Sequence, residues 1–216
     1  ENTHWSTHVF CAPERCFQDA RQHLDWGLFA PLYALHSSRS WGAGDLADLD
    51  GLIAWVASQG GRVAGTLPLL PAFLDRPAEP SPYSPVSRLF WNEFYLSLDD
   101  IPELAACPPA RRRLRSTGFQ AQVCALRQAP LVDFVSQMAL KREILTALSR
   151  FFFAHPSPRR DAFNQFLEAR PQLADYARFR ATQEERGRVW IRWPARLRDG
   201  LLRDTDCPRA RREYHL

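Results

Sequence analysis

The sequence predicts an α/β fold that opens with a strand–helix–strand unit and continues into a largely helical region. Two short apolar runs, at 27–35 and 63–70, are bounded by polar residues and turn formers, as buried strands are. Apolar residues at helical spacing lie between them and dominate again after residue 131. The two strands start roughly 35 residues apart, which fits a unit of a (β/α)8 (TIM) barrel at about 31 residues and, almost as well, a doubly wound sheet.

The first unit is predicted in order along the chain. The run 27–35 is expected to be a buried strand, although Pro31 interrupts its hydrogen-bonding capacity. A helix of about four turns should follow, because apolar residues recur at 46, 49, 52, 53 and 56 and two glycines at 60–61 provide a stop. Asp45 precedes that helix, where a carboxylate can accept hydrogen bonds from free backbone N–H groups. The run 63–70 is then the second buried strand.

Proline dominates the segment that follows the second strand. Six of the eighteen residues from 68 to 85 are proline, which forbids a regular helix and predicts a stiff, extended loop. An aromatic-rich segment at 88–98 is expected to return in extended form. From about residue 131 the amphipathic pattern predicts helices, with breaks at Pro156, Pro158 and Pro171, and the run 190–194 ends them. The last three residues, 214–216, show no feature that closes a fold.

Composition excludes several classes of protein. With 216 residues, of which 45% are apolar, the chain can fill a core, and no apolar run approaches the roughly 18 residues of a membrane span. Five cysteines at irregular spacing indicate neither a disulfide framework nor a zinc ribbon, and a cytoplasmic location fits best. Since Glu1 is not a methionine, the natural N-terminus is expected to lie further upstream.

Nucleic-acid, metal and dinucleotide binding are also disfavoured. The net charge is +4, Lys141 is the only lysine, and the arginine clusters at 111–115 and 209–212 accompany no nucleic-acid-binding motif. The spacing of His4, His8, Cys11 and Cys16 fits no structural zinc site. A third glycine is missing from the Gly-Ala-Gly sequence at 42–44, which argues against a dinucleotide site.

Several motifs together resemble one enzyme family. They are RSWGAGDL at 39–46, LPLLP at 67–71 and SPYSPVSRLFWN at 81–92, with PERCF at 13–17 upstream, and DYARF at 175–179 and Trp190-x-x-Trp193-Pro194 downstream. In this order they resemble the amylomaltases, or 4-α-glucanotransferases (disproportionating enzyme, glycoside hydrolase family 77). The resemblance covers almost the whole chain.

The family resemblance implies a fold, an activity and a set of partners. It implies a cytoplasmic TIM barrel with inserted subdomains that transfers α-1,4-glucan segments between malto-oligosaccharides by a retaining double displacement, without a cofactor or metal. Family members carry the nucleophilic aspartate, the acid/base glutamate and a stabilising aspartate on later barrel strands, which this chain does not reach. We therefore expect an N-terminal part that is inactive alone, lacks catalytic residues of its own, and needs the C-terminal remainder of the barrel.

Three regions follow from this interpretation. Residues 1–26 form a leader that packs on the domain, 27–100 form the first βαβ unit with its proline-rich substrate loop, and 101–216 form a mainly helical inserted subdomain. A retaining transfer needs two carboxyl groups about 5–5.5 Å apart. The acids at 45, 75, 79, 99 and 100 are better explained as helix-cap, loop and turn residues than as such a pair.

Sugar binding is the function that the chain itself can supply. A pyranose ring needs an aromatic plate beside a few fixed hydrogen-bonding groups. The resemblance places Tyr83 as the platform and Ser81 as its hydrogen-bonding neighbour. Weaker candidates are Asn92, Trp41, Asp45 and His36.

Two other functions remain open at the level of the sequence. Another amylase-like retaining hydrolase would share these strands and use water as its acceptor. A truncated helical module that binds glucan or protein would catalyse nothing. A glucan substrate is the partner expected in the first two cases, and neither nucleic acid nor a membrane is expected in any of them.

Overall fold

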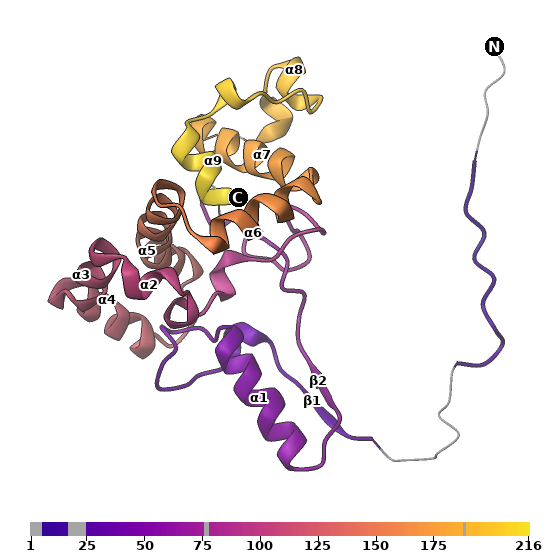
Figure 1. Cartoon of the computed structure of the whole chain (residues 1–216). Coiled ribbons are helices and arrows are strands. Elements are labelled where there is room, and N and C mark those ends of the chain that lie inside the picture. Colours follow the sequence, from indigo (N-terminus) through magenta and orange to yellow (C-terminus); the bar gives the residue numbers. More distant parts are fainter. Residues whose placement is uncertain (1–5, 17–24, 76–77, 188) are drawn as a thin grey trace.

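The computed structural model describes residues 6–16, 25–75, 78–187 and 189–216 (Figure 1). These residues are mostly helical and include one two-stranded sheet, in which β1 (Gly27–Phe29) and β2 (Val63–Gly65) run parallel with Gly27 opposite Val63. Helix α1 (Leu46–Ser58) connects the two strands and lies beside them. The predicted strand–helix–strand order is confirmed.

The prediction that both strands are buried is wrong. All three residues of β1 are exposed, and Phe29 retains 65% of its accessible surface. Burial of a parallel strand requires neighbours on both faces, and within the described residues this sheet has two short strands and open outer edges. The first apolar run is buried beyond β1, at Leu32 in the 3-10 helix η1 (Leu32–Ala34), which begins after Pro31.

Gly27 is required where the two strands meet. A Cβ atom at this position would lie 2.0 Å from the carbonyl oxygen of Val63, closer than real Cβ contacts come. A hydrogen bond from the Ala30 N–H to the Gly65 oxygen (3.0 Å) and one from the Leu32 N–H to Thr66 Oγ1 (2.9 Å) continue the connection beyond the paired residues.

Helix α1 starts as the sequence predicts. The Asp45 Oδ1 atom accepts hydrogen bonds from the N–H groups of Ala47 (3.0 Å) and Asp48 (3.2 Å), and Asp48 Oδ2 accepts one from the Asp45 N–H (3.0 Å). This capping box satisfies backbone donors that have no partner within the helix.

Replacing this cap should destabilise the chain measurably. We expect Asp45→Ala to lower the free energy of unfolding by about 1 kcal/mol, because two N–H groups lose their acceptor. Urea unfolding followed by circular dichroism measures the change. Asp50→Ala, at an exposed position of the same helix, is the control, and an equal loss in both variants would show that the cap is unimportant.

The segment between β2 and the helical region is less extended than predicted. It contains the 3-10 helices η2 (Glu93–Tyr95) and η3 (Leu98–Asp100). Asn92 Oδ1 accepts a hydrogen bond from the Phe94 N–H (3.0 Å) and so caps η2. The prediction of an extended 88–98 segment is wrong at these two turns, because a local cap and the burial of Phe94 favour a helical turn there.

The helices begin earlier than residue 131. Those before it are α2 (Glu103–Ala106), α3 (Pro108–Arg115) and α4 (Thr117–Gln128); those after it are α5 (Phe134–Ala154), α6 (Pro158–Glu168), α7 (Gln172–Arg186), η4 (Trp190–Arg192), α8 (Ala195–Arg198), η5 (Asp204–Asp206) and α9 (Arg209–His215). The arginine-rich α3 contains few apolar residues, so the sequence shows little of the apolar periodicity that predicts a helix there. The predicted breaks near residues 156–158 and at Pro171 are confirmed.

Helix α5 joins two hydrophobic cores. One lies among the helices and includes Phe119, Ile144 and Leu148. The other unites the N-terminal segment with α5 and includes Leu32, Phe94, Met138 and others. The N-terminal unit is thus packed against the helical region through α5.

Lys141 connects the same two regions through hydrogen bonds. Its side chain on α5 is 3% exposed, and Nζ donates to the carbonyl oxygens of Phe94 (2.7 Å) and Leu96 (2.8 Å). Burial lowers the pKa of Lys141 to about 8, against the opposite effect of Asp45 and Asp48. The sole lysine of the chain is therefore an internal structural residue.

Residues 214–216, in which the sequence shows no such feature, belong to or follow a helix that packs on the helical region. Helix α9 packs against α5 and α7, and His215 is buried. A seven-residue arginine-rich helix has almost no apolar periodicity of its own, so its packing could not be predicted from the sequence.

The N-terminal prediction of a packed leader is wrong for the described residues 6–16. They are exposed and form no regular element, and Phe10 retains 92% of its accessible surface. Its apolar side chains Val9 and Phe10 lie in solvent and pack against no other part of the described chain. His4 and the last residue of the PERCF motif lie outside the described residues.

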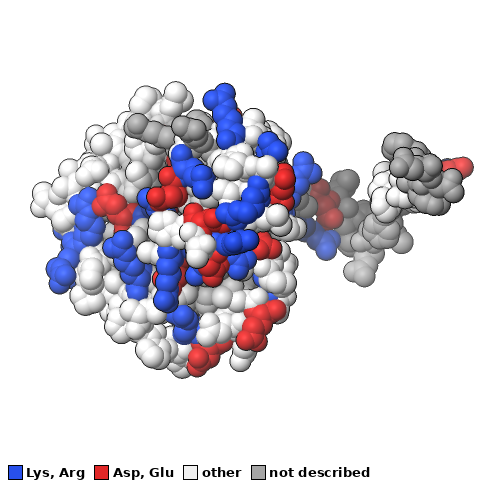
Figure 2. Space-filling model, turned by 90° about the horizontal axis from the view of Figure 1, so that it is seen from above, with Lys and Arg blue, Asp and Glu red and all other residues white. Residues whose placement is uncertain are grey.

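Charge is distributed in pairs over the molecule (Figure 2). Basic and acidic side chains alternate on the face shown, and several C-terminal arginines have carboxylate partners: Arg178 and Arg212 with Asp204, Arg209 with Glu213, and Arg211 with Glu185. Across the described part of the chain, no helix is long and apolar enough to cross a membrane.

Candidate functional site

The proline-rich loop is held by two backbone hydrogen bonds at its base and one further along it. The Asn92 N–H donates to the oxygen of Leu69 (2.9 Å), and the Val86 N–H donates to that of Pro71 (2.8 Å). Within the loop, the Glu79 N–H donates to the oxygen of Phe73 (2.6 Å), which pairs these residues in an isolated antiparallel bridge. Prolines restrict the backbone of the rest of the loop, so few hydrogen bonds are needed to hold its conformation.

Ser81 and Tyr83 lie on this loop. The Glu79 carboxylate accepts a hydrogen bond from the Ser81 N–H (3.2 Å), and Ser81 Oγ accepts one from the Tyr83 N–H (3.3 Å). Tyr83 retains 72% of its accessible surface. Its ring therefore makes little contribution to packing and is free to meet a ligand.

Asn92 lies in a different environment from Tyr83. It is 8% exposed and its Oδ1 atom is engaged in the cap of η2. It lines a small cavity of about 190 Å³ together with Trp91, which is 74% exposed, and Leu46 at the start of α1. The structure thus brings Asn92 close to the N-terminus of the helix that Asp45 caps.

The remaining predicted residues, Trp41, Asp45 and His36, lie outside the loop that carries Tyr83. Trp41 packs edge-on against Phe119, with ring centroids 5.3 Å apart, and the Asp45 carboxylate is engaged in its capping box. His36 is exposed. Among the described residues, no hydrogen bond or ring contact joins Trp41, Asp45 or His36 to the loop that carries Tyr83.

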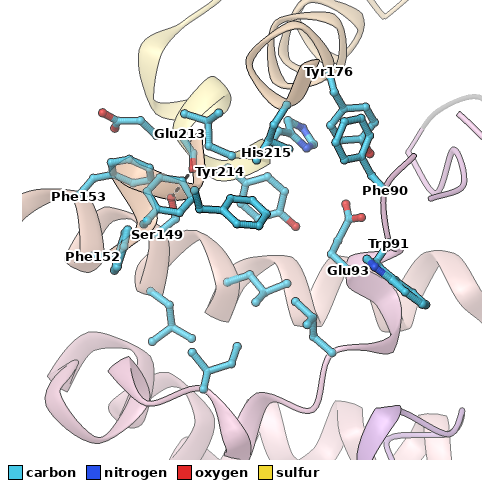
Figure 3. Close-up of a pocket in the computed structure, with 18 of the residues that line it drawn as sticks. Phe90, Trp91, Glu93, Ser149, Phe152, Phe153, Tyr176, Glu213, Tyr214 and His215 are labelled. Carbon is cyan, nitrogen blue, oxygen red and sulfur yellow. Dashed lines mark hydrogen bonds between the residues drawn. The ribbon is translucent and has the colours of Figure 1, made fainter. Parts of the chain in front are cut away.

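A larger cavity lies beside the 89–96 segment (Figure 3) and was not predicted. It has a volume of about 720 Å³ and is lined by this segment and by α5, α6, α7 and α9. Phe90 and Tyr176 face each other on one side, with ring centroids 4.4 Å apart, and Glu93 lies near them. The sequence contains the aromatic residues, but their convergence depends on contacts between distant segments.

A buried charged cluster adjoins that cavity. Glu184 on α7 forms an ion pair with Arg142 and accepts a hydrogen bond from His215 Nε2 (2.7 Å). Burial alone would raise the pKa of Glu184, but the hydrogen bonds from His215 and Arg142 lower it to about 2. Burial lowers the pKa of His215, and the hydrogen bond and charge of Glu184 oppose that effect.

Arg180 extends this cluster to the proline-rich loop. It is 2% exposed, its Nη2 atom lies 4.0 Å from Glu184 Oε1, and its Nη1 atom lies 3.7 Å from Asp75 Oδ1. In the sequence, Arg180 is distinguished only by its position directly after the DYARF motif, so its contact with the loop was not predicted.

Three of the acids considered in the sequence analysis have structural roles. Asp45 caps α1, Asp75 faces Arg180, and Glu79 accepts a hydrogen bond within its loop. No group of three or more His, Cys, Asp or Glu side chains within the described ranges is arranged to hold a metal ion.

Comparison with known proteins identifies the family. The model of a family described as 4-alpha-glucanotransferase matches residues 30–214. A 4-alpha-glucanotransferase of Mycobacterium bovis is 39% identical over 184 residues, which are 80% of this chain and 24% of that protein. One from Haemophilus influenzae is 38% identical over 150 residues, covering 66% of this chain and 21% of that protein.

A solved structure agrees with these matches. The crystal structure of amylomaltase from Corynebacterium glutamicum superposes with a TM-score of 0.67 at 26% identity, covering 88% of this chain and 25% of that one. The chain spans about a quarter of the length of the relatives it matches. Since the family model covers far more than half of its residues, the chain belongs to the 4-alpha-glucanotransferase family.

Proposed function

We propose that this chain forms the opening strands of a TIM barrel and a helical inserted subdomain of a 4-α-glucanotransferase. The parallel β1–α1–β2 unit supports the barrel assignment, because parallel strands joined by a helix are its repeating element. In this proposal residues 1–26 are a leader, 27–100 supply the barrel unit with the substrate loop, and 101–216 supply the subdomain.

The proposed reaction moves an α-1,4-glucan segment from one malto-oligosaccharide to another with retention of configuration. A carboxylate attacks the anomeric carbon while a carboxylic acid protonates the leaving oxygen. The hydroxyl of the sugar acceptor then displaces the enzyme carboxylate and returns its proton to the group that acted as acid. We assign both groups to the rest of the polypeptide, in keeping with the structural roles of Asp45, Asp75 and Glu79. The reaction needs no added cofactor, and we place it in the cytoplasm.

The contribution of this chain is to bind the sugar. The observation that carries the proposal is the exposed ring of Tyr83 on a loop whose backbone is fixed by Ser81 and the surrounding prolines. A ring held in place before the sugar arrives loses little entropy on binding. It can cover the apolar face of a pyranose, while Ser81 on the same loop meets a hydroxyl group of the sugar.

Maltotriose distinguishes this function from the alternatives. We expect the 216-residue chain alone to leave maltotriose unchanged, because the proposal assigns both catalytic carboxyl groups to the rest of the polypeptide. A polypeptide extended to the full length of the relatives should convert maltotriose into glucose and longer malto-oligosaccharides, as followed by chromatography.

Three results would contradict the proposal. Transfer by the short chain would show that it holds its own catalytic groups. Glucose and maltose without longer products from the extended polypeptide would indicate a hydrolase. An extended polypeptide that leaves maltotriose intact would indicate a module that catalyses nothing.

A further inference from the structure

We propose that Arg180 is a positioning residue that holds the loop of Ser81 and Tyr83 against α7. The inference rests on the proposed sugar-binding role of this loop. Arg180, although remote from Tyr83 in the sequence, fixes the orientation in which Tyr83 meets the sugar.

The first observation is the place of Arg180 between α7 and the loop. On its own helix, Arg180 Nη1 donates to Gln183 Oε1 (2.9 Å), which fixes the direction of the guanidinium group. Toward the loop, Nη1 lies 3.7 Å from Asp75 Oδ1, and the guanidinium carbon lies 5.5 Å from the centroid of the Phe73 ring. Arg180 therefore contacts the loop through an ion pair and a cation–π interaction.

The second observation is a continuous series of hydrogen bonds from that contact to Tyr83. The Phe73 oxygen accepts from the Glu79 N–H, the Glu79 carboxylate accepts from the Ser81 N–H, and Ser81 Oγ accepts from the Tyr83 N–H. A shift of Phe73 away from α7 would move the start of this series, so the position of Tyr83 depends on the contact with Arg180.

The third observation concerns the kind of contact that Arg180 makes. Asp75 Oδ1 and Arg180 Nε are buried and have no hydrogen-bond partner among the described residues. The pair is held by charge at 3.7 Å rather than by a closed hydrogen bond. A side chain that keeps the positive charge should therefore keep much of the contact, whereas an apolar side chain of similar length should lose it.

Hydrogen–deuterium exchange of the loop tests this role directly. We expect Arg180→Met to speed exchange in a peptide covering 78–86 by at least about tenfold, with labelling times that start at milliseconds, and to weaken maltotriose binding by a similar factor. Arg180→Lys should restore most of the protection. Arg178→Met is the matched control, since Arg178 lies on the same helix but pairs with Asp175 and Asp204.

Asp75→Asn approaches the same contact from the loop. The Asp75 side chain is 20% exposed, so its neutral isostere leaves the interior of α7 intact and tests the contact even where Arg180→Met does not fold. We expect the same faster exchange in 78–86 and normal exchange in α4. A loop unaffected by both substitutions, equal loosening of α4, or failure of lysine to restore protection would overturn the inference.

These outcomes are separate from those that test the proposed function. If the wild-type chain bound no maltotriose while both substitutions loosened the loop, Arg180 would keep its positioning role and the sugar site would be wrong. If the wild-type chain bound maltotriose and neither substitution altered the loop or the binding, the site would stand and the role of Arg180 would be wrong.

Discussion

Replacing Tyr83 by alanine is expected to lower the transfer efficiency of the complete enzyme by about 10- to 1000-fold, which corresponds to roughly 1.4–4 kcal/mol of lost transition-state stabilisation. The physical reason is the loss of an aromatic plate that the loop holds ready for an apolar sugar face. Because the ring is 72% exposed, its removal should leave the melting temperature nearly unchanged. Tyr83→Phe, which retains the plate, should have a milder effect.

Steady-state kinetics with maltotriose and a thermal melt measure the two quantities separately. Leu131→Ala is a suitable control, because Leu131 is 81% exposed and lies just before α5 rather than on the loop. A fall of many degrees in melting temperature with normal kinetics of the folded Tyr83→Ala enzyme would identify a residue that packs the loop.

Glu184→Gln should produce the largest loss of stability. The substitution leaves the partly exposed Arg142 guanidinium without its carboxylate, and breaking this half-buried ion pair should cost about 2–4 kcal/mol, between the values for surface and fully buried pairs. Glu185→Gln is the matched control on the adjacent position, because Glu185 pairs with Arg211 at the surface and should contribute at most about 0.5 kcal/mol. Denaturant unfolding at pH 7 compares the two variants, and equal losses would contradict a special role of the buried cluster.

The same carboxylate predicts how stability depends on pH. The pKa of Glu184 is lowered to about 2, from an ordinary value of 4.5, so its stabilising contribution is complete above pH 4.5 and is lost as the pH falls toward 2. The difference corresponds to about 3 kcal/mol. The pKa of His215 is lowered as well, so protonation of the unfolded chain weakens the fold below about pH 6.5.

Unfolding curves at pH 7, 5 and 3 measure this profile. The wild-type chain should lose stability at each step, and Glu184→Gln should lose less between pH 5 and 3 than the wild type does. An identical acid profile in both proteins would show that other carboxylates determine the acid sensitivity.

The sequence predicts best those features whose causes are local. Helix α1 combines a cap at Asp45, a regular apolar spacing and glycines after its end, and all three signals lie within about one element. The proline-rich loop is similarly local, because proline restricts its own backbone and that of the residue before it.

Burial and side-chain networks depend on partners that sequence spacing does not reveal. The runs that contain β1 and β2 are apolar enough for a core, yet Phe29 is exposed because its burial requires further layers on the sheet. Arg180 and Glu184 are neighbours at helical spacing, but the contact of Arg180 with Asp75 joins segments far apart in the sequence, and no local pattern reveals it. For Ser81, Tyr83, Asn92, Trp41 and Asp45, the roles in sugar binding stay predictions.

The single lysine of the chain offers a chemical reporter of internal motion. Reagents that acylate amines require an accessible, uncharged amino group, and Lys141 is buried with its amine bonded to Phe94 and Leu96. Acylation at this position therefore requires a separation of α5 from the 92–96 segment, which are the parts that join the two cores. Its rate would report how often the N-terminal unit and the helical region come apart, at one site and without an introduced label.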